Sequence, residues 1–348
     1  MLSSSPRSGV QWAKAIGLAV MQAAISLSWV AYNLYLPGFL TQFGLPQSYG
    51  VGLLIAESVL AIGGNPALSP LLLTLLILWS MAMAAFRSPA ICLLGIAAFE
   101  TQLPQAASVL NLAGAVVGTL NTFAQPKNFI LGLGAPVTFA IASAVLLAAT
   151  AVLRWVYPPQ VLASYSDTTT IPWSRQLLYK LGCVFGVGVG ISLGTRLINT
   201  VLKHPTTSPG LLVGIFTMTF LVAVLPAGWL SSKVGNQRTL LLGSGLMALV
   251  LPGLVWAIES PLAAGLTVLL GIGSALLSNG TVAYALSMAP RSQIGLGAGI
   301  FFGGSALAGA LFGLLLQMGP IALPIAAIGG TLAFVGVGLL VWQGQQVR

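Results

Sequence analysis

Charged residues are scarce in this chain of 348 residues, where they make up only 5% of the sequence. Apolar residues make up 57%, and the mean hydropathy is +0.99. Such a composition excludes a water-soluble domain and is typical of a chain that crosses a bilayer several times. The sequence therefore predicts an all-α, multi-pass protein of the cell membrane whose main partner is the lipid bilayer.

The residue types that most catalytic and metal sites need are also nearly absent. The chain has four acidic residues, a single histidine (His204) and two cysteines, Cys92 and Cys183, which both lie in apolar runs. One histidine excludes the His-paired zinc motifs, and the cysteines indicate neither a disulfide framework nor a metal site. No catalytic triad, dinuclear site or nucleotide-binding loop can be assembled from the sequence. We therefore expect no enzyme activity, no metal and no cofactor.

The net charge of +9 does not indicate a nucleic-acid partner, because the 13 basic residues are spread along the chain without a cluster. They orient the protein instead. If both termini are cytoplasmic, two basic residues, Lys127 and Lys203, are outside. The larger inside set is then Arg7, Lys14, Arg154, Arg175, Lys180, Lys233, Arg238, Arg291 and Arg348. This excess favours that orientation, because basic residues concentrate in cytoplasmic loops.

Apolar runs divide the chain into two halves. We expect an amino-terminal bundle over residues 1–156, a cytoplasmic central loop over residues 157–176, and a carboxy-terminal bundle over residues 177–348. The expected spans outside the segment Gly50–Ala98 are Trp12–Leu40, Gln105–Phe123, Ile130–Trp155, Leu177–Leu202, Pro209–Ala227, Leu240–Ile258, Leu262–Met288, Gly295–Met318 and Ile321–Trp342. Glycines recur at intervals of four in the series Gly295, Gly299 and Gly303 and in the pair Gly309 and Gly313, and they are expected to let helix backbones approach closely.

The 49 residues from Gly50 to Ala98 have room for two spans of about 20 residues each. The expected total is therefore about 11 helices, five in the first half and six in the second. An odd number of crossings cannot place both ends on one side of the membrane. Either one segment between Gly50 and Ala98 does not cross, or the amino end lies outside.

The stretch Ser208–Leu242 joins two spans through a short basic connection, Gly228–Arg238. It resembles the signature between paired helices of the major facilitator superfamily. The matching positions are Gly228, Leu230, Ser231, Lys233, Gly235, Asn236 and Arg238, and Ser232 replaces the usual acid. The resemblance implies a facilitator fold of two pseudo-symmetric bundles that rock around a central site, with this connection as a conformational gate. An ordinary positive-inside loop is the alternative interpretation.

A second resemblance lies at the end of the first span. Tyr32, Asn33, Tyr35 and Pro37 match a Tyr-Asn-x-Tyr-x-Pro pattern of the sucrose-transporter-like and glycoside:cation symporter branch. Phenol and amide groups of this kind line cavities that hydrogen-bond solute hydroxyls. An aromatic belt at the membrane interface explains the tyrosines equally well but leaves Asn33 unexplained. Against the pattern of the superfamily, the third span of the first half is missing.

Polar and charged residues within apolar runs are the remaining site candidates. Glu57 lies within an expected span, where a carboxylate is costly unless it is protonated, paired or facing water, so we predict that it is the proton-linked group. Arg87 and Arg196 are predicted to turn towards the space between the halves, although Arg196 has the alternative of reaching the headgroups. Asn111 also lies in a span, where a small polar residue more often packs between helices than binds a ligand.

These features together predict a secondary transporter, driven by protons, for a small neutral solute such as a sugar. The alternative is a degenerate, non-transporting facilitator-like scaffold or assembly factor, because a missing span is expected to impair alternating access. A bundle that lacks one helix leaves a groove, which lipid, a second protomer or a partner helix would fill.

Overall fold

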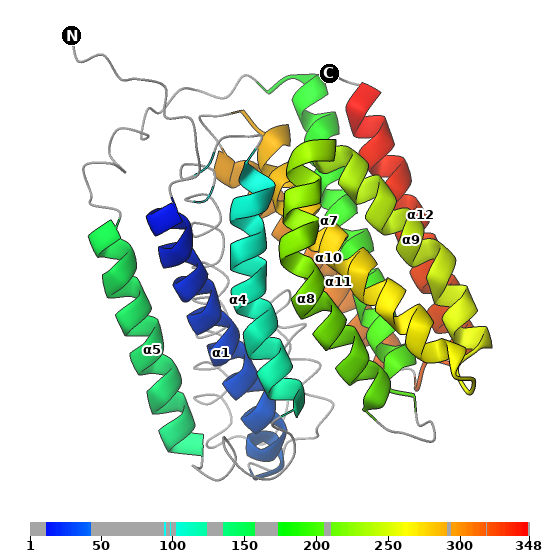
Figure 1. The fold of residues 1–348 in the computed structure, drawn as a ribbon, viewed down its shortest axis with the longest axis horizontal. Helices are drawn as coiled ribbons and strands as arrows, with labels where there is room; N and C mark the ends of the chain where they lie inside the picture. The colour runs from blue at the N-terminus through cyan, green and yellow to red at the C-terminus, as the bar shows by residue number, and fades with distance from the viewer. Residues whose placement is uncertain are drawn as a thin grey trace, which may run out of the picture.

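The computed structural model describes residues 12–42, 94, 98, 102–123, 135–156, 173–204, 210–290, 294–317 and 319–346. In α1 the description of side chains ends at residue 27. The described segments form long helices that run side by side, with no strand among them (Figure 1). Their bounds are α1 Trp12–Gln42, α4 Leu103–Phe123, α5 Ala135–Val156, α7 Arg175–Leu202, α8 Leu211–Val234, α9 Asn236–Trp256, α10 Leu262–Met288, α11 Ile294–Gln317 and α12 Leu323–Gln346. The all-α fold expected from the composition is confirmed.

Within the described residues, the six helices α7 to α12 are long and apolar enough to cross a membrane. Their outward faces are apolar as well. Leu249 of α9 is 79% exposed and Val222 of α8 is 73% exposed, which in water would be unfavourable. Trp155 and Trp256 are exposed at helix ends, where amphipathic rings favour the headgroup region. The surface is therefore that of a protein surrounded by lipid.

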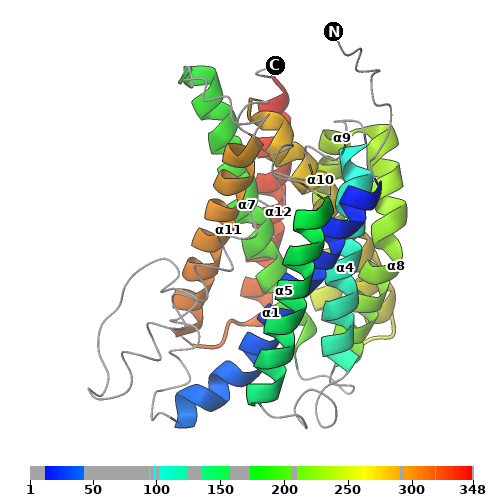
Figure 2. The same cartoon turned by 90° about the vertical axis from the view of Figure 1, so that its left-hand side faces the viewer.

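The first half repeats the packing of the second half around its first helix. In the second half α7 packs against α11 and α12, and in the first half α1 packs against α4 and α5 (Figure 2). In each half the first helix thus contacts the two helices that close that half. This is the arrangement that an internal structural repeat produces.

The two halves meet mainly where α4 packs against α8 and α10. One buried apolar cluster crosses this boundary, because Leu18 and Ile25 of α1 and Ala107 of α4 belong to the same cluster as Ala283 and Leu286 of α10. A second, larger cluster holds the helices of the second half together. The halves are therefore joined by side-chain packing as well as by the chain.

The expected connection over Gly228–Arg238 is mostly helical, which corrects the sequence interpretation. Helix α8 continues to Val234, α9 begins at Asn236, and only Gly235 separates them. Gly235 has φ of 96° and ψ of 149°, a backbone conformation that residues with a Cβ atom rarely adopt. The apolar run ended earlier than the helix because polar residues at the membrane surface remain helical when their backbone hydrogen bonds continue.

The close approach of α7 and α11 depends on glycines other than the predicted ones. A Cβ atom at Gly188 would collide with the carbonyl oxygen of Phe301, and one at Gly304 would collide with that of Phe185. Among the described residues, nothing lies within 4 Å of a Cβ atom at Gly299 or Gly303, whereas one at the predicted Gly309 would lie 2.9 Å from Nη2 of Arg196 on α7. The spacing of four residues identified one face of α11, but the close contact with the α7 backbone at Gly304 lies on another face of that helix.

Both described ends of the chain lie on one face of the bundle. Helix α1 begins and α12 ends at the face that carries the α8–α9 junction, and α5 ends and α7 begins there too (Figure 1). We call it the α8–α9 face, and its basic residues Lys233 and Arg238 predict that it is cytoplasmic. The described part of the chain therefore begins and ends at the same face. The number of spans between Gly50 and Ala98 lies outside the described residues.

Candidate functional site: a polar cavity between the two halves

Two consecutive hydrogen bonds donated by side-chain amides link α4 of the first half to α10 and α8 of the second half, in the middle of the bundle. Asn111 of α4 donates from Nδ2 to Oδ1 of Asn279 on α10, at 2.8 Å. Asn279, which has no exposed surface, donates from its own Nδ2 to the carbonyl oxygen of Val224 on α8, at 2.6 Å. Both amides lie within apolar helices, where a buried polar group needs such partners. The bonds therefore fix α4, α8 and α10 relative to one another in this state.

A cavity of about 210 Å³ lies beside Asn111, walled by α1, α4, α7, α10 and α11. Its polar lining residues are Gln22, Asn111, Ser192, Ser278, Thr281 and Ser305. Phe301 and Phe302 add two aromatic rings in an edge-to-face pair, with centroids 5.3 Å apart. All of these residues occur well inside their helices, so the cavity lies deep within the membrane-spanning part of the protein.

A second cavity of about 270 Å³ shares Gln22 and Asn111 with the first and continues between α4 and α8. Thr119 and Thr217 line it, together with Phe220. Thr119 follows Asn111 by eight residues on α4, which places it about 12 Å farther from the α8–α9 face. The polar space around Asn111 therefore extends towards the face opposite the α8–α9 junction.

Towards the α8–α9 face, α4 and α8 are in close contact. Gly228 approaches α4 so closely that a Cβ atom there would lie 2.5 Å from Oγ of Ser108, and also against its Cβ atom. Nearby, Nε2 of Gln105 donates to Oγ of Ser232, at 3.0 Å. These contacts close the α4–α8 boundary on this side of the cavity.

The described residues that line the two cavities include no charged side chain. Several hydroxyls already donate to carbonyl oxygens, such as Thr281 to Leu277 at 2.5 Å and Ser192 to Ser305 at 3.1 Å. The Thr119 hydroxyl is buried and has no hydrogen-bond partner among the described residues. Among the described residues, the Gln22 amide makes one long bond, from Nε2 to Oγ of Ser26, at 3.4 Å. The site thus offers amide and hydroxyl groups to a neutral polar molecule.

The structure brings one of the predicted site residues, Asn111, into this cavity. Arg196 does not line it: its guanidinium lies over the Phe312 ring of α11, 5.9 Å from the centroid, and close to Gly309. Tyr32, Asn33 and Tyr35 lie on α1, but their side chains are not among those described. Glu57 and Arg87 lie outside the described residues.

The predicted gate residues gather where α8 meets α9. Gly228 forms the close contact with α4, and Gly235 forms the turn between the helices. Lys233 and Arg238 are exposed at this face, and Lys233 Nζ lies 3.7 Å from the centroid of the Trp229 ring. The signature positions therefore lie together at the end of α8 and the start of α9. None of them lines the two cavities around Asn111.

Sequence reasoning missed most of the residues that form the cavity. Asn279 carries the same signal as Asn111, an amide inside an apolar run, and the sequence Ser278-Asn279-Gly280 could have drawn attention to it. Gln22 also interrupts an apolar run. Thr119 and Thr281 carry no such signal, because threonine hydroxyls commonly bond to the carbonyl of the preceding turn of their own helix.

Known proteins resemble this chain in two ways. Residues 181–345, a little under half of the chain, match the family model described as Major Facilitator Superfamily. The fold resembles a bacterial homologue of the iron transporter ferroportin in an outward-facing state, with TM-score 0.60 and 13% identity over 97% of this chain and 88% of that chain. It also resembles the human organic anion transporter MFSD10 (TETRAN), with TM-score 0.57 and 14% identity over 99% of this chain and 100% of that chain. No curated protein sequence matches the chain significantly.

At these identities the solved structures define the fold and not the solute. The resemblance of Tyr32 to Pro37 to the sucrose-transporter-like branch, and the missing third span, stay predictions. The protein is a multi-pass integral membrane protein with the major facilitator fold, and its carboxy-terminal half carries the sequence pattern of that superfamily.

Proposed function

We propose that this protein is a secondary active transporter that moves a small, neutral, hydroxyl-rich solute across the membrane by alternating access. The observation that carries the proposal is the uncharged cavity around Asn111, deep in the bundle and at the boundary of the two halves. Transporters of this architecture place their solute site near the midplane, between the repeats. A cavity at that place also favours transport over the scaffold alternative.

The chemistry of the cavity matches a neutral polyhydroxylated solute. An amide presents both a donor and an acceptor, so the Gln22 and Asn111 side chains suit a hydroxyl that donates and accepts. The Thr119 hydroxyl has the same dual capacity and no partner among the described residues. The faces of Phe301 and Phe220 supply apolar surface for the C–H face of a ring-shaped solute. A charged solute would find no opposite charge in the described walls.

Alternating access requires the solute to bind the two conformations with different strength. In the described state the α4–α8 boundary is closed towards the α8–α9 face by Gly228 and by the bond from Gln105 to Ser232. The polar space instead extends past Thr119 towards the opposite face. We infer that this state faces outward, and that α4 and α8 separate at Gly228 when the protein turns inward.

Glu57 remains our proposed proton-coupling group. The described cavity lining holds no carboxyl, so coupling by protons needs an acid outside that lining. Glu57 lies inside an expected span, whereas Glu259 follows the end of α9. The same proposal includes a groove beside the Glu57 span, left by the missing helix. Lipid, a second copy of the chain or a partner helix would fill it.

Uptake by proteoliposomes tests the function. The purified full-length protein is reconstituted and offered labelled hexose, disaccharide and polyol, with an organic acid and an organic cation of similar size for comparison. We expect accumulation of a neutral solute under an imposed proton gradient. Uptake of the charged solutes alone would refute the neutral-solute class, and no uptake or binding of any solute would favour the scaffold alternative.

A matched pair of variants ties uptake to the cavity. Thr281 and Thr195 both donate to a carbonyl of their own helix, at 2.5 and 2.7 Å, but only Thr281 lines the cavity. Thr281→Val is expected to lower uptake several-fold and Thr195→Val to leave it unchanged. Asn111→Leu removes an amide from both cavities and is expected to lower uptake about tenfold or more, the effect of roughly 1.4 kcal/mol. Equal effects of the two threonine variants would place the solute elsewhere.

A further inference from the structure

A polar pocket at the α8–α9 face has no role in the proposed solute pathway. It has a volume of about 560 Å³ and lies between the α8–α9 junction and the ends of α10 and α12. It is separate from the solute cavities, with which it shares no lining residue. Its polar and charged lining residues include Ser231, Lys233, Gln237, Arg238, Ser287 and Gln345.

The pocket has positive charge without a compensating acid among the described residues. Lys233 and Arg238 are both exposed and both line it. Ser232, at the position where the resembled signature has an acid, is neutral. The one acid in the described part of the chain, Glu259, lies beyond the other end of α9, about 30 Å away along a helix of 21 residues. An anion in the pocket would therefore meet two uncompensated cations.

The first turn of α9 adds hydrogen-bond donors to this charge. Asn236, Gln237 and Arg238 open the helix and line the pocket, and their backbone N–H groups have no acceptor within the helix. Gly235 precedes them without a capping side chain, and no acidic residue occurs in the first turn. The amino-terminal end of a helix attracts anions through these amides and through the helix dipole.

Two buried side-chain atoms in the pocket wall have no partner among the described residues. One is the hydroxyl of Ser231, a residue with no exposed surface, and the other is Nε2 of Gln237. Buried polar atoms are nearly always hydrogen-bonded, so each unpartnered one calls for an explanation. A bound group with several acceptor oxygens would satisfy both donors.

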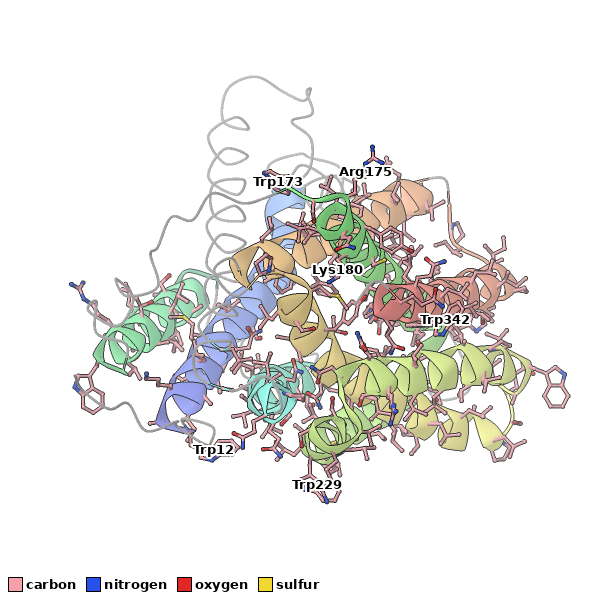
Figure 3. All side chains as sticks on the ribbon, turned by 90° about the horizontal axis from the view of Figure 1, so that it is seen from above. Trp12, Trp173, Arg175, Lys180, Trp229 and Trp342 are labelled. Atoms are coloured by element: carbon pink, nitrogen blue, oxygen red, sulfur yellow. The ribbon has the colours of Figure 1, made fainter. Side chains whose placement is uncertain are left out.

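We propose that this pocket binds a phosphate group. Lys233 and Arg238 balance its charge, and the α9 amides and the Ser231 hydroxyl donate to its oxygens. Lys233 lies over the ring of Trp229, which points out from α8 at the edge of the bundle (Figure 3). Trp229 is 54% exposed on the lipid side. The phosphate group therefore has two possible sources, the headgroup of an anionic phospholipid beside Trp229 and a free phosphate in the cytoplasm.

The occupant would bridge the ends of several helices. Its ligands come from the α8–α9 junction, while Ser287 of α10 and Gln345 of α12 line the other side of the pocket. Because α10 also packs against α4, a bound phosphate group would stabilise the closed α4–α8 boundary described above. Binding of this kind raises the thermal stability of the protein in proportion to the logarithm of ligand concentration.

Thermal unfolding of the full-length protein in neutral detergent micelles tests the proposal without a transport assay. The probes are inorganic phosphate against chloride at equal ionic strength, and dioleoylphosphatidylglycerol against dioleoylphosphatidylcholine in mixed micelles. We expect the unfolding midpoint to rise with phosphate, with phosphatidylglycerol, or with both. A response to phosphatidylglycerol alone identifies the headgroup as the source, and saturation by inorganic phosphate identifies a free phosphate.

Three variants assign the response to the pocket. The double variant Lys233→Gln, Arg238→Gln is expected to weaken the apparent affinity about tenfold or more, because charge-assisted bonds are lost. Ser231→Ala is expected to weaken it several-fold while leaving the midpoint without ligand unchanged or higher. Lys203→Gln removes one positive charge at the opposite end of α7 and is expected to have no effect. The proposal is overturned if neither probe exceeds its comparison, or if Lys203→Gln lowers the affinity as much as the double variant.

Discussion

The hydrogen bond between Asn111 and Asn279 makes a quantitative prediction about the conformational equilibrium. If this bond exists only in the described state, Asn111→Ala removes its contribution from that state alone. Hydrogen bonds between helices in membranes contribute about 0.6 kcal/mol on average and at most about 1.7 kcal/mol. The substitution should therefore shift the ratio of the two conformations about 3-fold to 20-fold away from the described state.

The accessibility of Thr119 reports this shift. Thr119 lines the cavity on the side away from the α8–α9 face, so a cysteine there should react faster in the described state. In a background with Cys92 and Cys183 replaced by serine, Thr119→Cys is labelled with a membrane-impermeant maleimide. With rapid exchange between the conformations, the labelling rate follows the population of the described state. It should therefore fall in the Asn111→Ala variant, and by the full factor estimated above when the described state is the minor one.

A double-mutant cycle separates this bond from other effects of the substitutions. Asn279→Ala removes the same bond and also the bond to Val224, so its effect should be larger than that of Asn111→Ala. If the two amides act through each other, Asn111→Ala should add little to a protein that already carries Asn279→Ala. Fully additive effects, or a labelling rate that none of the variants changes, would refute the reasoning.

Three further predictions concern packing, coupling and topology. Gly304→Ala should cost about 1–3 kcal/mol of stability and so lower the thermal unfolding midpoint, because its Cβ atom meets the α7 backbone. The neighbouring Gly303→Ala should be neutral or stabilising, and equal midpoints of the two variants would contradict this. Glu57→Gln should abolish accumulation against a gradient in proteoliposomes and leave solute exchange partly intact, and unchanged pH-dependent accumulation would reject the assignment. An experimental structure should contain two crossings between Gly50 and Ala98 beside a groove in the first bundle, and three complete crossings would show that no span is missing.

The sequence predicted the helices more reliably than the contacts between them. The bounds of α10 agree with the expected span, Leu262–Met288, and those of α7 and α11 agree to within two residues. Length and hydropathy suffice for this, because a bilayer requires about 20 apolar residues per crossing and every backbone group must bond within its own helix. The end of α8 was predicted too early, since polarity at the membrane surface does not end a helix.

The cavity could be predicted only in part, for a different physical reason. Asn111 stood out because an amide in an apolar run needs a partner, but nothing in the sequence identified that partner as Asn279, 168 residues away. Thr119 and Thr281 could not be recognised, because a threonine that lines a cavity and one that bonds only to its own helix look alike in sequence. The same limit led to the choice of Gly299 and Gly303, whose face of α11 has no close neighbour among the described residues.

The sequence by itself determined that this protein is helical and lies in the membrane, and its basic residues indicate which face is cytoplasmic. Each of these properties depends on the free energy of transferring side chains between water and lipid. Because that free energy is a sum over single residues, a short stretch of sequence is enough to estimate it. Only the tertiary structure decided that α4 meets α8 and α10, that amides from both halves join there, and that Ser231 and the first turn of α9 form one pocket. These depend on which helix faces meet, and helices that are apolar on every side carry little information about that choice.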